Sequence, residues 1–288
     1  MIKVISPGFY TSVQDMGRIG FRNQGVPTSG CLDSVSANLA NLLVNNTNEC
    51  ALLEITMFGP KLKFLQSYAI AIVGAYMEPK LNEKVIANNC LIQVNANDVL
   101  SFGKLKKGVR AYLAIGGGID SSKILSSRSQ FYPITTNAKI EKNDCLTVQV
   151  KRNPTNQLMN ASVANKVDFY DKNKIQVSKG PDFEIFEKED LAQLFNKKFS
   201  VSNNNDRMGY QLNELLFRHS KSLITSPVIP GTVQFLPNGK LVVLMKDGQT
   251  TGGYPRILQL TELSIAILAQ KKVGDEFYFE LTPTINLT

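Results

Sequence analysis

The chain has 288 residues, of which 43% are hydrophobic, and it carries a formal net charge of +8 with a pI near 9.2. This length suits two modest domains or one large one, each with a substantial core. The basic residues are scattered and form no stripe interleaved with aromatic residues, which argues against nucleic acid as a partner. The four cysteines and the single histidine are spaced too widely for a zinc finger or a disulfide scaffold, so we expect no metal site.

The N-terminus predicts neither an export signal nor a membrane segment. Residues 1–8 lack the apolar stretch of a signal peptide. The longest apolar run, around 69–73, is far shorter than the roughly 20 residues that a spanning helix needs. We therefore expect a cytoplasmic protein with no membrane partner.

The first predicted elements are a short strand over 2–5 and a bent, exposed loop over 11–21. Two glycines in this loop flank an arginine, so the loop can present Asp15 and Arg18 together. Two interpretations stay open for Arg18, because a guanidinium serves equally to pair with Asp15 and shape the loop or to bind an anionic ligand.

The clearest helix of the first half is predicted over 34–46, with Asp33 as its N-cap. Its apolar face is predicted to contain Val35, Leu39, Leu42 and Leu43. Cys31 lies just before this helix with no histidine close in sequence, so a nucleophilic role for it has little support.

From residue 51 the pattern changes to short strands separated by Gly, Pro and Asn turns, which favours a closed or nearly closed β-barrel. The predicted strands are 52–57, 62–65, 69–73, 84–86, 91–94, 99–102, 110–115 and 146–150. Glu54 alternates with apolar residues, and we favour a buried acid with partners over a site acid. The glycines at 116–118 lack the G-K-[ST] of a phosphate-binding loop.

The polar segment 151–174 indicates a linker or long surface loop, which divides the chain into halves at 1–160 and 161–288. The second half is again rich in strands, and Arg207-Met208-Gly209-Tyr210 echoes the run from Arg18 to Phe21. His219 has no partner motif that would make it a base. The predicted elements are strands at 175–178, 198–201 and 276–281, a hairpin at 232–236 and 240–245, and helices at 188–195 and from the cap Thr261 through 270, the last with Leu263, Ile267 and Leu268 inward.

The loop over 246–256 contains the most unusual chemistry of the chain, because it places K-D-G-Q-T-T-G-G-Y-P-R directly after a buried strand. Gly252-Gly253 permits a close backbone approach to a ligand, and Tyr254-Pro255 fixes an extended exit. The loop offers amide donors, two hydroxyls, one carboxylate and one aromatic face. On the residues alone it is either a polar turn or a site for a small anionic or amide-bearing molecule.

This loop resembles the D-x-Q-T-T-G-G-Y-P signature of the 5-oxoprolinase C-type protein family, also described as allophanate hydrolase subunit 2 or as the antagonist of a sporulation-kinase inhibitor. The family is similar to the carboxyltransferase domain of urea carboxylase. Further matches are V-Q-D-x-G-R-x-G at 13–20, G-x-P-x-S-G-x-x-D at 25–33 and D-R-M-G at 206–209. The L-G-S-R-S-T motif is kept in part, because Ser126 and Gln130 replace its glycine and threonine around Arg128.

The resemblance implies a mainly β fold with a few helices, made of two cyclophilin-like β-barrel halves. It also implies one component, inactive alone, of a 5-oxoprolinase complex that opens the lactam of 5-oxoproline to glutamate. The partners would be the A-type and B-type components of that enzyme, with ATP used by the complex at a site not assigned to one of them. The candidate catalytic residues are Asp247, Tyr254 and Arg207. The candidate substrate-binding residues are Arg18, Arg128, Gln234, Gln249, Thr250, Thr251, Gly252 and Gly253.

Two other functions stay open. Biotin-dependent carboxyl transfer, of the urea or allophanate type, follows from the urea carboxylase likeness. Lys246 is not followed by the methionine of a biotin acceptor, so we expect no biotin attached to this chain. The second is a non-catalytic regulator that binds a kinase inhibitor of the B-type. A metal hydrolase would lack ligands, and a serine hydrolase would lack a G-x-S-x-G and a histidine.

Overall fold

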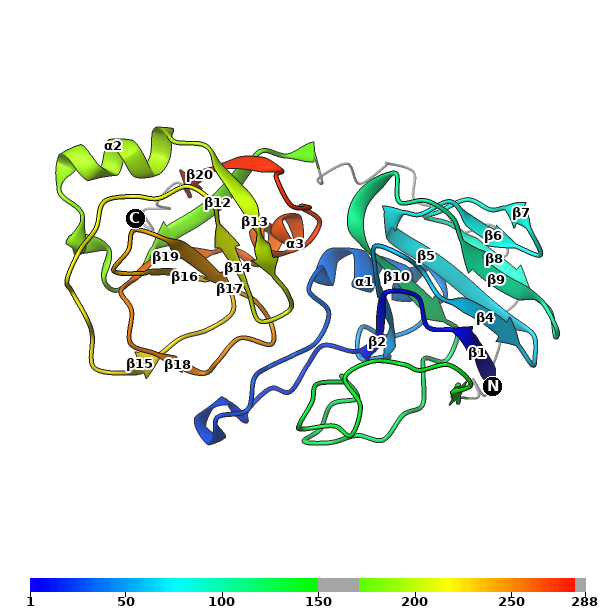
Figure 1. Ribbon diagram of the computed structural model, residues 1–288. Helices are drawn as coiled ribbons and strands as arrows, with labels where there is room; N and C mark the ends of the chain where they lie inside the picture. Colours follow the sequence, from blue (N-terminus) through cyan, green and yellow to red (C-terminus); the bar gives the residue numbers. More distant parts are fainter. Residues whose placement is uncertain (150–170, 283–288) are drawn as a thin grey trace, which may run out of the picture. The chain divides into compact units, whose positions relative to one another are not determined.

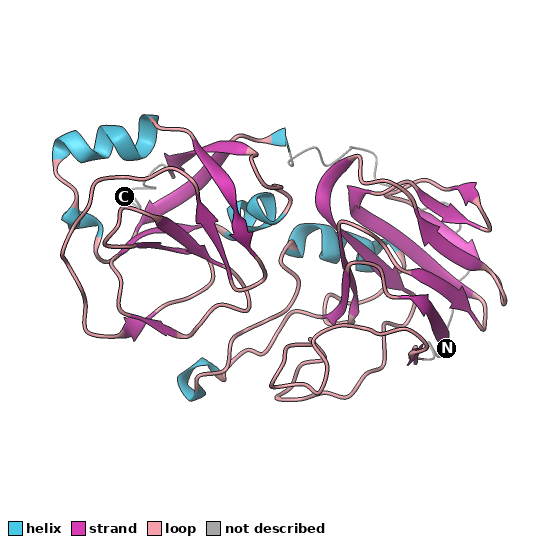
Figure 2. Ribbon diagram, viewed as in Figure 1, coloured by secondary structure: helices cyan, strands magenta, loops and turns pink. Residues whose placement is uncertain are grey.

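The computed structural model describes residues 1–149 and 171–282, and it divides the chain into two compact units (Figure 1). Unit 1 contains Met1–Ile19 and Ser29–Val167, and unit 2 contains Gly20–Thr28 and Asp168–Thr288. Strands dominate both units, so the prediction of a mainly β fold with a few helices is confirmed (Figure 2). The predicted division at 160/161 and most of the predicted linker lie outside the described residues.

Unit 1 is built from two antiparallel sheets. The six-stranded sheet has the order β11(Cys145–Leu146), β1(Ile2–Ser6), β4(Lys61–Phe64), β9(Val99–Phe102), β6(Pro79–Leu81), β7(Lys84–Val85). The five-stranded sheet has the order β2(Tyr10–Gln14), β3(Leu52–Thr56), β10(Lys107–Ile115), β5(Tyr68–Tyr76), β8(Leu91–Val94). The predicted loop over 11–21 is therefore wrong in its first part, which pairs with β3 as β2.

The two faces of the five-stranded sheet are buried by different partners. Side chains alternate along a strand. Leu53, Ile72 and Leu113 join the main core with residues of the six-stranded sheet. Leu52 and Tyr112, which point the other way, pack with residues of α1(Ser34–Leu43) and of the turn before it. The helix therefore covers the second face of the sheet.

The N-cap of α1 was predicted correctly, and its buried face was not. The Asp33 carboxylate accepts a hydrogen bond from Ser36 N at 2.9 Å. Leu42, predicted to be buried, is 67% exposed. The residues that bury are Ser36, Ala37, Ala40, Asn41 and Leu43. Most of these are small, which lets the helix backbone come close to β5 and β10.

Unit 2 contains a closed barrel of seven strands among its described residues. Around the barrel the order is β12(Lys174–Lys179), β19(Arg256–Leu260), β16(Thr232–Phe235), β17(Leu241–Leu244), β14(Gly209–Leu212), β13(Phe199–Asn205), β20(Glu276–Leu281). Only β12 and β20 pair in parallel. Buried Val177, Val233, Tyr210 and Phe279 belong to its core. The predicted hairpin is β16 and β17, joined at Asn238-Gly239.

The remaining elements of unit 2 lie around the barrel. They are η1(Arg22–Gln24), η4(Phe183–Ile185), α2(Lys188–Asn196), α3(Glu262–Ala269) and the short pair β15(Ser226–Pro227) and β18(Thr251–Gly252). Thr261 caps α3 as predicted, since its side chain accepts from Ser264 N. Leu263 was predicted to point inward, but it is 41% exposed at the first turn, while 264–269 are buried.

Candidate functional site

A groove of about 520 Å³ lies on the outer face of the barrel, over β14, β17 and β16. The register places Gln211 opposite Val242 and Val242 opposite Gln234, so these three form one row across the strands. Their neighbours Tyr210 and Val243 are buried, because side chains alternate between the two faces. The other lining residues are Asn203, Asn204, Asn205, Asp206, Met208, Gly209, Leu236, Leu244, Gln249 and Tyr254.

The glycine-bearing loop covers the end of this row at Gln234. Gln249 Nε2 donates to Gln234 Oε1 at 3.2 Å. A Cβ on Gly252 would lie 2.2 Å from Gln234 Nε2, so only glycine fits there without a shift. Gln234 is 2% exposed although it lies on the outer face, and among the described residues its Nε2 has no hydrogen-bond partner. Tyr254, 42% exposed, leaves its ring accessible at the groove.

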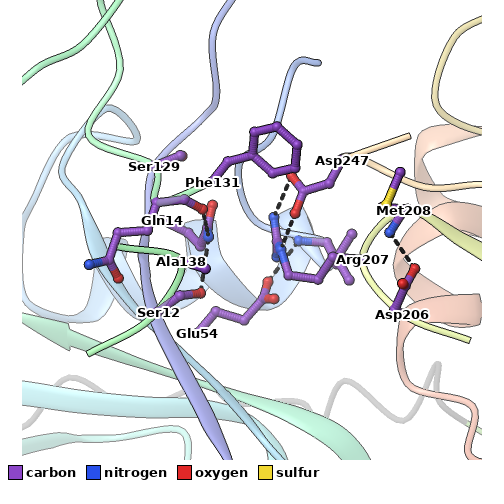
Figure 3. Close-up of polar contacts among 12 residues, drawn as sticks. Ser12, Gln14, Glu54, Ser129, Phe131, Ala138, Asp206, Arg207, Met208 and Asp247 are labelled. Carbon is purple, nitrogen blue, oxygen red and sulfur yellow. Dashed lines mark hydrogen bonds and ion pairs between the residues drawn. The ribbon is translucent and has the colours of Figure 1, made fainter. Parts of the chain in front are cut away.

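Arg207 and Asp247 form a buried ion pair just behind the groove (Figure 3). Arg207 Nε donates to Asp247 Oδ2 at 2.7 Å, and Nη2 donates to Oδ1 at 3.3 Å. The backbone joins them as well, since Asp247 N donates to the Arg207 carbonyl at 2.9 Å. The neighbouring Asp206 and Met208 line the groove, and Asp206 Oδ1 accepts from Met208 N at 2.7 Å. The structure thus brings two of the three predicted catalytic residues into contact.

The rest of the loop is held through its backbone. The Thr250 carbonyl accepts from Val228 N at 3.0 Å, and the Gly253 carbonyl accepts from Leu223 N at 3.0 Å. Thr251 pairs with Pro227 in the β15–β18 pair. The threonines and glycines predicted as binding residues therefore belong to an ordered loop above the barrel.

The predicted residues of unit 1 form a separate polar cluster around Asp15. Its carboxylate accepts from Ser127 Oγ at 2.6 Å, from Ser129 Oγ at 2.7 Å and from Arg128 N at 2.6 Å. The serines on each side of Arg128 are thus used to saturate one carboxylate. Arg18 is fully buried, and its Nη2 donates to the Ser129 carbonyl.

The Arg128 side chain itself lies against a carboxylate of the same unit. Its Nη2 is 2.8 Å from Asp120 Oδ1. Asp120 is partly exposed, whereas the arginine is mostly covered. Arg128, predicted to bind substrate, thus has an ion-pair partner within unit 1.

Glu54 is a fully buried acid with partners, as the interpretation we favoured requires. Its Oε2 accepts from Tyr112 OH at 2.9 Å and from Leu32 N at 2.8 Å, and its Oε1 lies 3.7 Å from Arg110 Nε. Burial, followed by the nearby Glu54 and Asp33 carboxylates, raises the pKa of Tyr112 well above its ordinary value.

Sequence reasoning missed Arg22, which contacts the glycine-bearing loop. Its Nη2 donates to the carbonyls of Val228 and, at 3.3 Å, of Gln249. Burial lowers the pKa of Arg22. No spacing pattern marks it, because its partners are backbone atoms more than 200 positions away.

Other expectations concern histidine, metals and membranes. The Nε2 of His219 lies 3.2 Å from the Phe235 carbonyl oxygen and its ring stacks near Phe235, away from the loop residues just described. Among residues 1–149 and 171–282, no three His, Cys, Asp or Glu side chains gather as metal ligands. No helix in the described part of the chain is long and apolar enough to cross a membrane.

The fold and the residue pattern agree with a carboxyltransferase-type domain. Residues 24–281 match the family model described as carboxyltransferase domain, subdomain A and B. This match takes in most of the chain, and the chain therefore belongs to that family. The resemblance inferred from the loop and the other motifs is confirmed.

Two curated relatives and one solved structure show the range of the family. The chain is 31% identical to the C-type component of 5-oxoprolinase from Escherichia coli (strain K12), over 97% of this chain and 90% of the relative. It is 26% identical to the C-type component from Haemophilus influenzae, over 97% and 91%. The crystal structure of Kluyveromyces lactis urea carboxylase superposes with a TM-score of 0.83 at 33% identity, over 96% of this chain and only 27% of that one.

Proposed function

We propose that this chain is one component of an ATP-dependent 5-oxoprolinase, which opens the 5-oxoproline lactam to L-glutamate together with proteins of the A-type and B-type in the cytoplasm. The observation that carries the proposal is the similarity to the C-type component of the Escherichia coli enzyme over nearly the full length of both chains. The complete loop over 246–256 and the buried pair of Arg207 with Asp247 support it.

In this proposal the groove takes the amide part of the substrate. Six of its lining side chains are carboxamides, which pair with the C=O and N–H of a lactam. The Val242, Leu236 and Leu244 side chains supply an apolar floor, and Tyr254 supplies an aromatic face. Gln234, whose buried Nε2 has no partner among the described residues, is the donor best placed to gain one.

The charged residues have different roles. Attack on a lactam carbonyl places negative charge on its oxygen, and positioned donors must stabilise that charge. We assign this role to the amides of Gly252 and Gly253 and to Arg207, with Asp247 fixing the orientation of the guanidinium. Gln249, Thr250 and Thr251 hold the loop and the amide group. Arg18 and Arg128, which are engaged within unit 1, support the architecture.

ATP fits poorly in the groove. Phosphate groups need several donors or cations, and the only charged lining residue is the Asp206 carboxylate. The sequence also lacks a phosphate-binding loop. We therefore assign the nucleotide to another component of the complex and derive no step of the reaction through it on this chain.

Variants of the loop in the assembled enzyme test these roles. Removal of a positioned donor or of a proton-transfer group lowers turnover by roughly 10²–10³-fold in comparable sites. We expect losses of this order for Asp247→Ala and Tyr254→Phe, measured as glutamate release. Tyr132→Phe, at an exposed tyrosine of unit 1, is the matched control and should be silent. Full turnover of both loop variants would remove the assigned roles.

Carboxyl transfer is the second candidate, favoured by the family model and by the superposition on urea carboxylase. A biotin carried by another protein would then present its ureido ring, itself a cyclic amide, to the same groove. Transfer of labelled bicarbonate carbon to urea or a related amide, dependent on this chain and on a biotinylated partner, would support this candidate over lactam opening.

A further inference from the structure

We propose that Arg22 is a positioning residue for the glycine-bearing loop, acting from the short segment Gly20–Thr28 that packs with unit 2. The inference rests on the proposed function of that loop as a site. It assigns to Arg22 no contact with substrate. Its effect passes through the carbonyl groups of Gln249 and Val228.

Arg22 makes three polar contacts. Its Nη2 donates to the carbonyl of Val228 and, at 3.3 Å, to the carbonyl of Gln249. Its Nη1 donates to Thr28 Oγ1 at 3.3 Å, which fixes the guanidinium within its own segment. Two carbonyls from different segments thus meet at one nitrogen of a half-buried cation.

The Val228 contact extends the restraint along the loop. Val228 is 2% exposed, and its N donates to the Thr250 carbonyl at 3.0 Å. The preceding Pro227 carbonyl accepts from Arg256 Nη1 at 3.1 Å. Consecutive carbonyls at 227 and 228 are therefore each bound by an arginine, and the segment between them and the loop is the β15–β18 pair.

The loop needs such a restraint because little else fixes its middle. It contains two adjacent glycines, whose backbones are the freest of any residue, and its β15–β18 pair is only two residues long. A displaced Gln249 carbonyl would also displace the Gln249 amide from Gln234 and the accessible Tyr254 from the groove.

Arginine suits this role better than lysine. A guanidinium presents a planar set of five donors, so one side chain reaches Thr28 and both carbonyls at once. An ammonium is a compact point charge on a flexible stem. We therefore expect Arg22→Lys to keep only part of the restraint.

Hydrogen exchange of the isolated chain tests the inference without any assay of activity. We compare Arg22→Gln with the wild type and with Arg218→Gln, which removes an exposed arginine from the same unit. Loss of a charged hydrogen bond should speed exchange of the Val228 amide and of the peptide over 247–253 by about tenfold or more. Arg218→Gln should leave both unchanged. Unchanged exchange in Arg22→Gln would overturn the proposal, and Arg22→Lys, with an intermediate effect expected, replaces it if the first variant does not fold.

Chemical rescue separates positioning from a folding defect. In the assembled complex, Arg22→Ala should lose turnover mainly in kcat, and added methylguanidinium should restore part of it, while methylammonium should not. Failure of rescue together with native exchange in the loop would contradict the role. A wild-type complex without 5-oxoproline turnover would refute the proposed function and leave the exchange experiment to decide on Arg22.

Discussion

The Asp247 carboxylate meets the Arg207 guanidinium at two points, 2.7 Å from Nε and 3.3 Å from Nη2, with both side chains buried. This pair links the strand end before β14 to the start of the loop after β17. Because each charge has lost water, each depends on the other. The pair therefore stabilises both the barrel edge and the loop above it.

Asp247→Ala should lower the free energy of unfolding by about 3–5 kcal/mol, because it leaves a buried guanidinium without its carboxylate. Urea unfolding of the isolated chain measures this. Glu262→Ala is the control, since it removes an exposed partner of the neighbouring Lys246 and should cost at most about 1 kcal/mol. Equal effects of the two variants would show that burial of the pair contributes nothing.

Gly252→Ala should disturb the site through a steric clash. The added methyl group would lie 2.2 Å from Gln234 Nε2, and such crowding costs roughly 1–3 kcal/mol in packed regions. Gly253→Ala is the matched control, because its methyl would meet only the Leu223 carbonyl oxygen at 3.4 Å. Thermal unfolding should separate the two. If Gln234→Ala fails to relieve the Gly252→Ala defect, the clash is not its cause.

The sequence was most informative where local chemistry decides structure. Asp33 and Thr261 cap helices because a short polar side chain is needed at those positions, and Asn238-Gly239 forms a hairpin turn. Leu42 and Leu263 were misplaced, because the faces they were assigned from periodicity alone depend on which neighbours approach the helix. Arg22 was invisible, since its partners are carbonyls distant in sequence.

The candidate site shows the same division. The loop over 246–256 could be singled out because its residue types are unusual together, and the resemblance added Arg207 and Gln234. The groove depends on the register of β14, β17 and β16, which places Gln211, Val242 and Gln234 in one row. Register is set by long-range pairing, so no local pattern predicted this row.

Asp15→Asn should destabilise unit 1 by on the order of 3 kcal/mol, because the carboxylate accepts several charge-assisted hydrogen bonds that an amide would replace in part with donors. Differential scanning calorimetry of the chain checks this. Asp144→Asn, at a partly exposed turn acid, is the control. A native melting profile for Asp15→Asn would mean that the 127–129 loop does not depend on this carboxylate.

Tyr112 should make stability fall in alkaline solution. Its pKa is raised in the folded state, so above the ordinary value of about 10 the unfolded chain releases a proton that the folded chain retains. The contribution is fully present below about pH 10 and is lost as the pH rises toward the folded pKa. Urea unfolding between about pH 9 and pH 11 should show a steeper loss for wild type than for Tyr112→Phe. Parallel slopes, with Tyr132→Phe as the exposed control, would contradict this.

The most direct test of the proposed function measures glutamate and ADP formed from 5-oxoproline and ATP by this chain mixed with its A-type and B-type partners. Each component is then omitted in turn. The account predicts coupled release of glutamate and ADP that disappears when this chain is left out. Full activity without this chain, or a complex that forms and leaves 5-oxoproline intact, would contradict it.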